Sequence, residues 1–105
     1  MITGSYTLTS RFKNIPVPVM QQIKNSPEFQ RPDFQEMLQR DQVEIRFQGS
    51  HNGQGEIVTT GAVPGKYIAD GFLKAALVNS GLTGERVIPH DEAIGNLFAK
   101  VWDNN

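Results

Sequence analysis

The strongest constraint on the fold is a β-hairpin signal in the middle of the chain. Residues 43–47 alternate apolar and polar side chains, and residues 56–60 are rich in β-branched residues. Between these segments lies the pair Asn52-Gly53, and both residues tolerate the positive φ angles that a type I′ turn requires. The sequence therefore predicts two antiparallel strands joined by a tight turn at residues 52 and 53.

A turn centred on this pair determines which side chains face one another. It predicts Phe47 opposite Val58 and Ile45 opposite Thr60 across the hairpin. A β-bulge at either of the two glycines that flank the turn would shift this register.

Proline positions and amphipathic patterns divide the rest of the chain into short elements. Residues 6–13 alternate with period two, which predicts a strand with one apolar and one polar face. Two prolines then favour extended backbone, so a helix is expected only from about Pro18. In chain order the predicted elements are a strand over residues 6–13, a short helix from Pro18, a new helix start at Ser26-Pro27, a helix over 32–40, the hairpin, a main helix over 66–78, an optional edge strand at 86–89 and a C-terminal helix beginning near His90.

The main helix, over residues 66–78, has a broad apolar face that we expect to pack on the sheet. Asp70 and Lys74 are spaced i, i+4 and are predicted to pair on its exposed side. The apolar face comprises Ile68, Ala69, Phe72, Leu73 and Ala76.

These elements predict an α+β fold in a single domain that spans residues 1–105. A small antiparallel sheet of three to four strands carries helices packed on one face, in the order β-α-α-β-β-α-(β)-α. A chain of 105 residues can bury one core without disulfides or a structural metal. No segment approaches the ~20 apolar residues of a membrane helix, and no signal-peptide pattern opens the chain, so we expect a cytoplasmic protein without a membrane partner.

Catalytic and metal-binding patterns are weak. The chain has no cysteine, which excludes zinc fingers, iron–sulfur clusters and thiol catalysis. His90-Asp91-Glu92 contains the His-x-Glu spacing of zinc deaminases, but those enzymes also need a cysteine pair. His51 contributes to a metal site only if the fold brings it to His90, and Ser50 does not lie in a GxSxG elbow. We therefore expect no catalytic residue, no cofactor and no metal, and we favour a non-enzymatic role.

The segment from Gly61 to Lys66 is a candidate for binding a small anion. Free backbone N–H groups and the helix dipole at Gly65-Lys66 can hold a phosphate or carboxylate, and Lys66 adds charge. The segment is one residue shorter than a P-loop, and Tyr67 stands where the magnesium-binding hydroxyl belongs. A Pro/Gly turn is the main interpretation, and an anion site is the alternative.

The polar faces of the predicted strands combine into a mildly basic strip. Arg11 and Lys13 lie on the first strand and Arg46 on the second, while the aromatic residues have the opposite parity. The stacking platform that single-strand nucleic-acid binders use is therefore missing, and the net charge is only −1. Nucleic acid is a disfavoured partner. The remaining members of the strip are Thr7, Thr9, Gln48 and Thr59.

The predicted C-terminal helix carries an apolar stripe that a small sheet, shared with other helices, need not cover. Phe98 and Trp102 near its end are candidates for contact with a partner protein or with a second copy of the chain. The full stripe consists of Ile94, Leu97, Phe98, Val101 and Trp102.

The sequence thus favours a non-enzymatic protein-binding module, regulatory or accessory to another protein, which acts through surface contacts and can self-associate. The alternative is a small-ligand or phosphate-binding protein, an enzyme included, that uses the helix N-terminus at Gly65-Lys66. The third interpretation is weak nucleic-acid binding through Arg11, Lys13 and Arg46.

Overall fold

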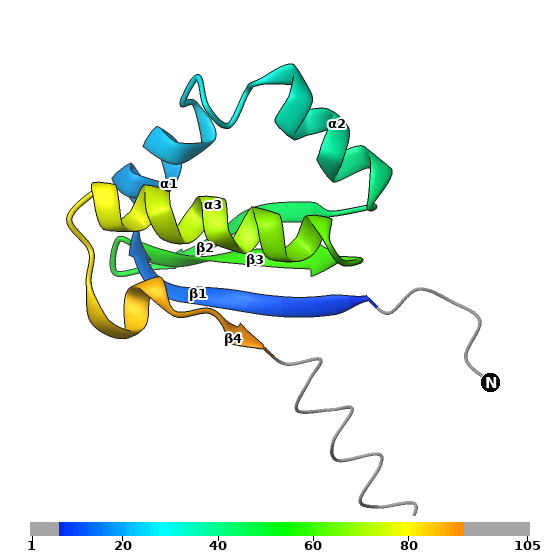
Figure 1. The fold of residues 1–105 in the computed structure, drawn as a ribbon. Coiled ribbons are helices and arrows are strands. Elements are labelled where there is room, and N and C mark those ends of the chain that lie inside the picture. Colours follow the sequence, from blue (N-terminus) through cyan, green and yellow to red (C-terminus); the bar gives the residue numbers. More distant parts are fainter. Residues whose placement is uncertain (1–6, 92–105) are drawn as a thin grey trace, which may run out of the picture.

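The chain forms an antiparallel sheet with its helices on one face (Figure 1). The structure is a computed structural model and describes residues 7–91. Three long strands and one short strand lie in the order β2-β3-β1-β4, and every neighbouring pair is antiparallel. This arrangement confirms the predicted α+β class and the order β-α-α-β-β-α. The strands are β1 (Leu8–Pro16), β2 (Glu44–His51), β3 (Gln54–Gly61) and β4 (His90–Asp91).

Three α-helices lie at or near the predicted positions. They are α1 (Val17–Lys24), α2 (Pro32–Arg40) and α3 (Gly65–Asn79). The Ser26-Pro27 pair does not start a helix: the Ser26 hydroxyl accepts a hydrogen bond from the Phe29 N–H at 3.2 Å, but the segment forms turns until Pro32. In Figure 1 the chain from α1 through α2 forms an arch beside α3.

The hairpin register differs from the prediction by one residue. His51 pairs with Gln54 around the expected turn, but Phe47 lies opposite Ile57, and Ile45 opposite Thr59. The shift arises between Gln48 and His51, where β2 carries one residue more than β3 and where Gly49 adopts φ +67°. A β-bulge at this glycine therefore moves the whole ladder by one position.

The C-terminal part also departs from the prediction. Residues 86–89 do not form an edge strand, because Gly84–Val87 is a short 3-10 helix (η1). His90–Asp91, where the sequence predicts the last helix to begin, is the two-residue strand β4, which pairs with Arg11 and Ser10. The rest of the predicted helix, with Phe98 and Trp102, lies outside the described residues.

The core lies between the sheet and the helices in two adjoining clusters. Ile45 packs against both of them. The larger cluster contains Phe12, Ile15, Met20, Ile23, Ile57, Leu73, Leu77 and Leu82, and the smaller contains Met37, Leu38, Val43 and Ala69. Within residues 7–91 no helix has the length and apolar character needed to cross a membrane.

Candidate binding groove along helix α3

The side of α3 that faces the sheet carries an ion pair. The ammonium group of Lys66 lies 2.5 Å from Asp70 Oδ2 and donates a second hydrogen bond to Ser10 Oγ at 2.8 Å. Thr59 Oγ1 donates to Asp70 Oδ1 at 2.6 Å. The predicted pairing of Asp70 with Lys74 on the exposed side is therefore wrong: Asp70 faces inward and its partner is Lys66.

This buried polar cluster is closed to ligands. Ser10 and Thr59 are fully buried, and the Lys66 side chain is 1% exposed. None of the four residues lines any of the four principal hollows of the described residues. Thr59 consequently does not belong to the exposed strip in which the sequence placed it. The cluster holds β1, β3 and α3 together, since its members come from all three elements.

The N-terminus of α3 is occupied by a carboxylate of the chain itself. Asp41 Oδ2 accepts a hydrogen bond from the Gly65 N–H at 2.8 Å. A Cβ atom on Gly65 would lie 2.5 Å from this oxygen, so glycine is required for the close approach. The Asp41 carboxylate therefore occupies the predicted anion site at Gly65-Lys66, and the charge of Lys66 is paired with Asp70 inside the fold.

The basic strip on the outer face of the sheet is largely neutralised by its neighbours. Arg11 lies 2.6 Å from Glu56, and Arg46 lies 3.5 Å from Glu44. Gln48 also donates to Glu56, at 3.2 Å. These pairs leave little positive charge for a polyanion.

Lys13 lies apart from the two arginines, at the hairpin end of the sheet. It lines a shallow polar hollow of about 590 Å³ together with His51. His90 pairs with Arg11 and lies on β4, at the opposite edge of the sheet from β2, so the two histidines do not meet. Among the described side chains, no group of three His, Asp or Glu is placed to hold a metal ion.

Two adjoining hollows run along one side of α3 and together form what we term the α3 groove. One, of about 450 Å³, lies beside α1, and the other, of about 400 Å³, lies beside α2. Glu28 and Phe72 line both of them. The α3 side of the groove consists of Ile68, Phe72, Ala75, Ala76, Asn79 and Ser80, and the opposite side of Gln22, Ile23, Ser26, Glu28, Arg31, Asp33, Phe34 and Met37.

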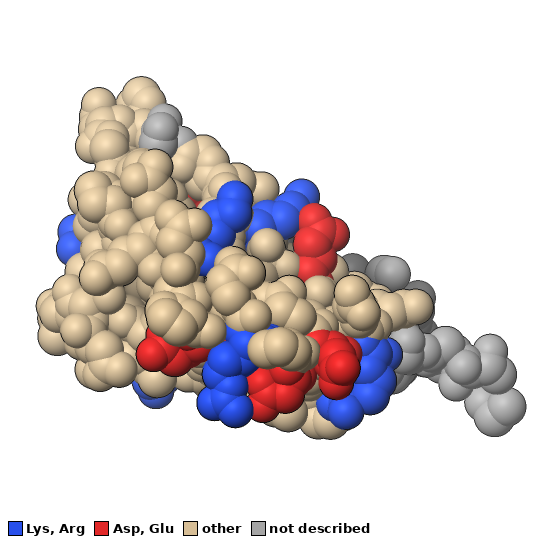
Figure 2. All heavy atoms as spheres, turned by 90° about the horizontal axis from the view of Figure 1, so that it is seen from above, with Lys and Arg blue, Asp and Glu red and all other residues tan. Residues whose placement is uncertain are grey.

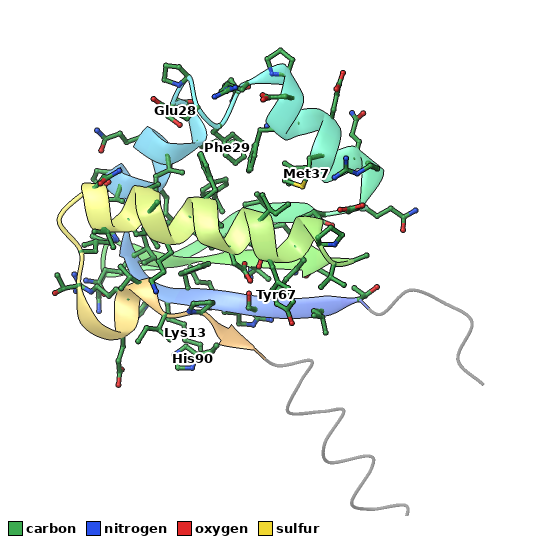
Figure 3. The ribbon with its side chains drawn as sticks, in the orientation of Figure 1. Lys13, Glu28, Phe29, Met37, Tyr67 and His90 are labelled. Carbon is green, nitrogen blue, oxygen red and sulfur yellow. The ribbon has the colours of Figure 1, made fainter. Side chains whose placement is uncertain are left out.

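Aromatic rings cluster where the two halves of the groove meet: Phe72 lines both halves, and Phe34 lines the half beside α2. The rings of Phe34 and Phe72 have centroids 4.6 Å apart, and Phe29 lies 6.2 Å from Phe72 and 5.6 Å from Phe47. Phe29, Phe34, Phe47 and Phe72 are all only half-buried. Figure 3 shows Phe29 beneath the arch and Met37 pointing from α2 toward α3. The arch and α3 thus enclose apolar surface that the chain's own core does not fully cover.

The predicted apolar face of α3 is divided between two environments. Ala69 and Leu73 are fully buried against the sheet, whereas Ile68 is 49% exposed on the groove side. The opposite wall is not evident from the sequence, because residues 25–31 have neither helical nor strand periodicity. The available signal was the width of the apolar face, which exceeds what one sheet contact buries.

The charges at the groove are few. Arg31 pairs with Asp33 at 2.9 Å, while Glu28 takes part in no ion pair of the described residues. Figure 2, which looks down on the helical side, shows basic and acidic side chains interspersed around a large uncharged area. No region of one sign extends across this side of the molecule.

No protein-family model matches the sequence, and comparison with curated proteins and with solved structures finds no match.

Proposed function

We propose that this chain is a non-enzymatic, regulatory or accessory protein-binding module, and that the α3 groove holds an apolar segment of its partner. The observation that carries the proposal is the continuity of the groove along α3, with the partly exposed rings of Phe34 and Phe72 at its centre. Half-exposed apolar surface in a concave site favours apolar side chains of another polypeptide. The proposal keeps the cytoplasmic location expected from the sequence.

The dimensions of the groove suit a short helical segment. Its α3 side extends from Ile68 to Asn79, which corresponds to about 16 Å at 1.5 Å per residue. Three turns of an amphipathic helix have the same length, and such helices bind through apolar residues spaced i, i+3, i+4 and i+7. A basic residue next to this apolar stripe would meet Glu28, which both halves of the groove share.

Two arrangements support this proposal over its alternatives. A phosphate ligand at Gly65-Lys66 would have to displace Asp41 and draw Lys66 out of its buried ion pair. A nucleic acid on the sheet would compete with the Glu56 and Glu44 carboxylates for Arg11 and Arg46. Neither competition exists in the α3 groove, where most of the exposed surface is apolar.

The proposal can be tested by selecting ligands from a random peptide library displayed on phage. Affinities of the selected peptides are then measured by fluorescence anisotropy. We expect Ile68→Glu to weaken their binding by about tenfold or more, because it places a charge in the apolar groove.

Val78→Glu provides a matched control for this substitution. Val78 lies on the same helix, is also 49% exposed, and does not line the groove. Its variant should bind the same peptides with unchanged affinity. Failure to enrich any peptide, or equal loss of affinity in both variants, would contradict binding at the groove.

A further inference from the structure

Within residues 7–91, the outer edge of β2 is an open edge of the sheet. β2 stands at the end of the strand order, with β3 as its one neighbour within the described chain. The opposite edge, β1, is covered at Ser10 and Arg11 by β4. An uncovered strand presents a row of backbone donors and acceptors, which another strand can complete.

β2 has few of the sequence features that prevent exposed edge strands from pairing with other strands. Residues 44–48 contain neither proline nor lysine, and the bulge at Gly49 lies beyond this regular part of the strand. Its exposed face instead carries opposite charges two residues apart, Glu44 and Arg46. Both side chains are at least half exposed, at 67% and 50%.

We infer that β2 pairs antiparallel with β2 of a second copy of the chain, about a two-fold axis at Ile45. In this register Glu44 lies opposite Arg46 of the second copy, and Arg46 opposite its Glu44. Residues that face each other across an antiparallel pair point to the same side of the sheet, so both pairs form on the outer face. Each carboxylate then has a guanidinium group beside it along its own strand and another across the interface.

Neighbouring registers lack this match. A two-fold axis at Arg46 places two arginines opposite each other, which like-charge repulsion disfavours. An axis at Phe47 brings Ile45 opposite Gly49, whose φ of +67° interrupts the extended strand. The charge pattern and the bulge therefore select the same register, centred on Ile45.

The resulting dimer has a single continuous sheet and carries both sets of helices on one face. The two α3 grooves consequently lie on the same side of the assembly. The interface uses the sheet edge and leaves the grooves free, so the dimer does not depend on the proposed binding function.

Light scattering coupled to size-exclusion chromatography, over a series of protein concentrations, tests the inference on the full chain. We expect twice the monomer mass of 11.7 kDa at high concentration. Glu44→Arg and Arg46→Glu should each remain monomeric, because each variant opposes like charges in both pairs of the interface. An equimolar mixture of the two variants should dimerise, since arginines of one chain then face glutamates of the other.

The mixture also shows that the single variants are folded, because unfolded chains would not recover a dimer of defined mass. The charge-exchanged variant Glu44→Arg/Arg46→Glu should dimerise alone, and dimerisation should weaken as salt is raised. Glu85→Arg, an exposed charge reversal in η1, serves as a control and should leave the dimer intact. A wild-type chain that stays monomeric at every concentration, single variants that still dimerise, or a mixture that stays monomeric would each overturn the inference.

Discussion

Replacing Asp70 by alanine would leave the ammonium group of Lys66 inside the protein with the Ser10 hydroxyl as its remaining hydrogen-bond partner. The position offers no route to solvent, since the Lys66 side chain is 1% exposed. An unpaired buried charge keeps the cost of its lost hydration without the compensating attraction of a counter-ion. Breaking a buried ion pair in this way typically costs about 3–5 kcal/mol.

The two partners should not be equivalent. Without Lys66, the Asp70 carboxylate retains hydrogen bonds from the Ser10 and Thr59 hydroxyls, at 3.1 and 2.6 Å. Lys66→Met, which preserves most of the side-chain volume, should therefore cost less than Asp70→Ala, about 2 kcal/mol. Removing both charges in Lys66→Met/Asp70→Leu should restore stability to within about 1 kcal/mol of wild type. Ser10 and Thr59 remain satisfied in the double variant because their hydroxyls lie 2.8 Å apart.

Urea denaturation followed by far-ultraviolet circular dichroism measures these differences. For a domain of this size, with an m-value of about 1.5 kcal/mol/M, a loss of about 4 kcal/mol lowers the urea midpoint by roughly 2.5 M. A Lys66→Met/Asp70→Leu variant no more stable than Asp70→Ala would refute the reasoning, because removal of the buried ammonium group would then have relieved no cost. An Asp70→Ala variant whose free energy of unfolding lies within about 0.5 kcal/mol of that of wild type would also refute it.

Three further predictions concern the backbone at the N-terminus of α3, at the hairpin and at the exposed side of α3. Asp41→Ala removes the acceptor at the N-terminus of α3 and should lower the free energy of unfolding by about 1–2 kcal/mol. Calorimetry would register this as a fall in Tm of roughly 4–8 °C per kcal/mol. Glu36→Ala, at an exposed position of α2, is the control and should change Tm little. Gly55→Ala should destabilise the hairpin by about 2 kcal/mol or more, because the added Cβ collides with the Gly49 carbonyl oxygen and lies 2.7 Å from that of Gln48. Gly71→Ala meets nothing within 4 Å on the exposed side of α3 and should stabilise the protein by about 0.5–1 kcal/mol in urea titrations. A Gly55→Ala variant as stable as wild type would show that the hairpin does not need this close approach.

Local signals in the sequence predicted most of the elements. The Asn52-Gly53 turn, the α2 helix over residues 32–40 and the extent of α3 all rest on patterns within a few residues, and the structure confirms them. The hairpin register could not be read in the same way, because a bulge depends on how two strands fit each other. Gly49 supplies the conformational freedom for a bulge but does not show that one forms.

The inward position of Asp70 shows why helix periodicity alone was insufficient. A charged residue is assigned to the exposed side of a helix unless a partner inside the fold is known, and here the partners come from β1 and β3. The signal that could have revealed them is Ser10, which shares strand parity with Phe12 and hence faces the core. A serine on the core side requires a polar neighbour, and α3 supplies it.

The outer wall of the α3 groove belongs to a segment that is fastened to the sheet at both ends. At one end the Val17 N–H donates to the Gly53 carbonyl at 3.0 Å, and at the other the Ala62 N–H donates to the Asp41 carbonyl at 3.1 Å. Gly53 and Ala62 lie immediately before and after β3, so the two attachment points of the arch lie at opposite ends of that strand. These two attachments oppose any opening of the wall about a hinge at one end. On the proposed function, a partner segment would enter a site that is already shaped, and its binding would cost little of this chain's conformational entropy.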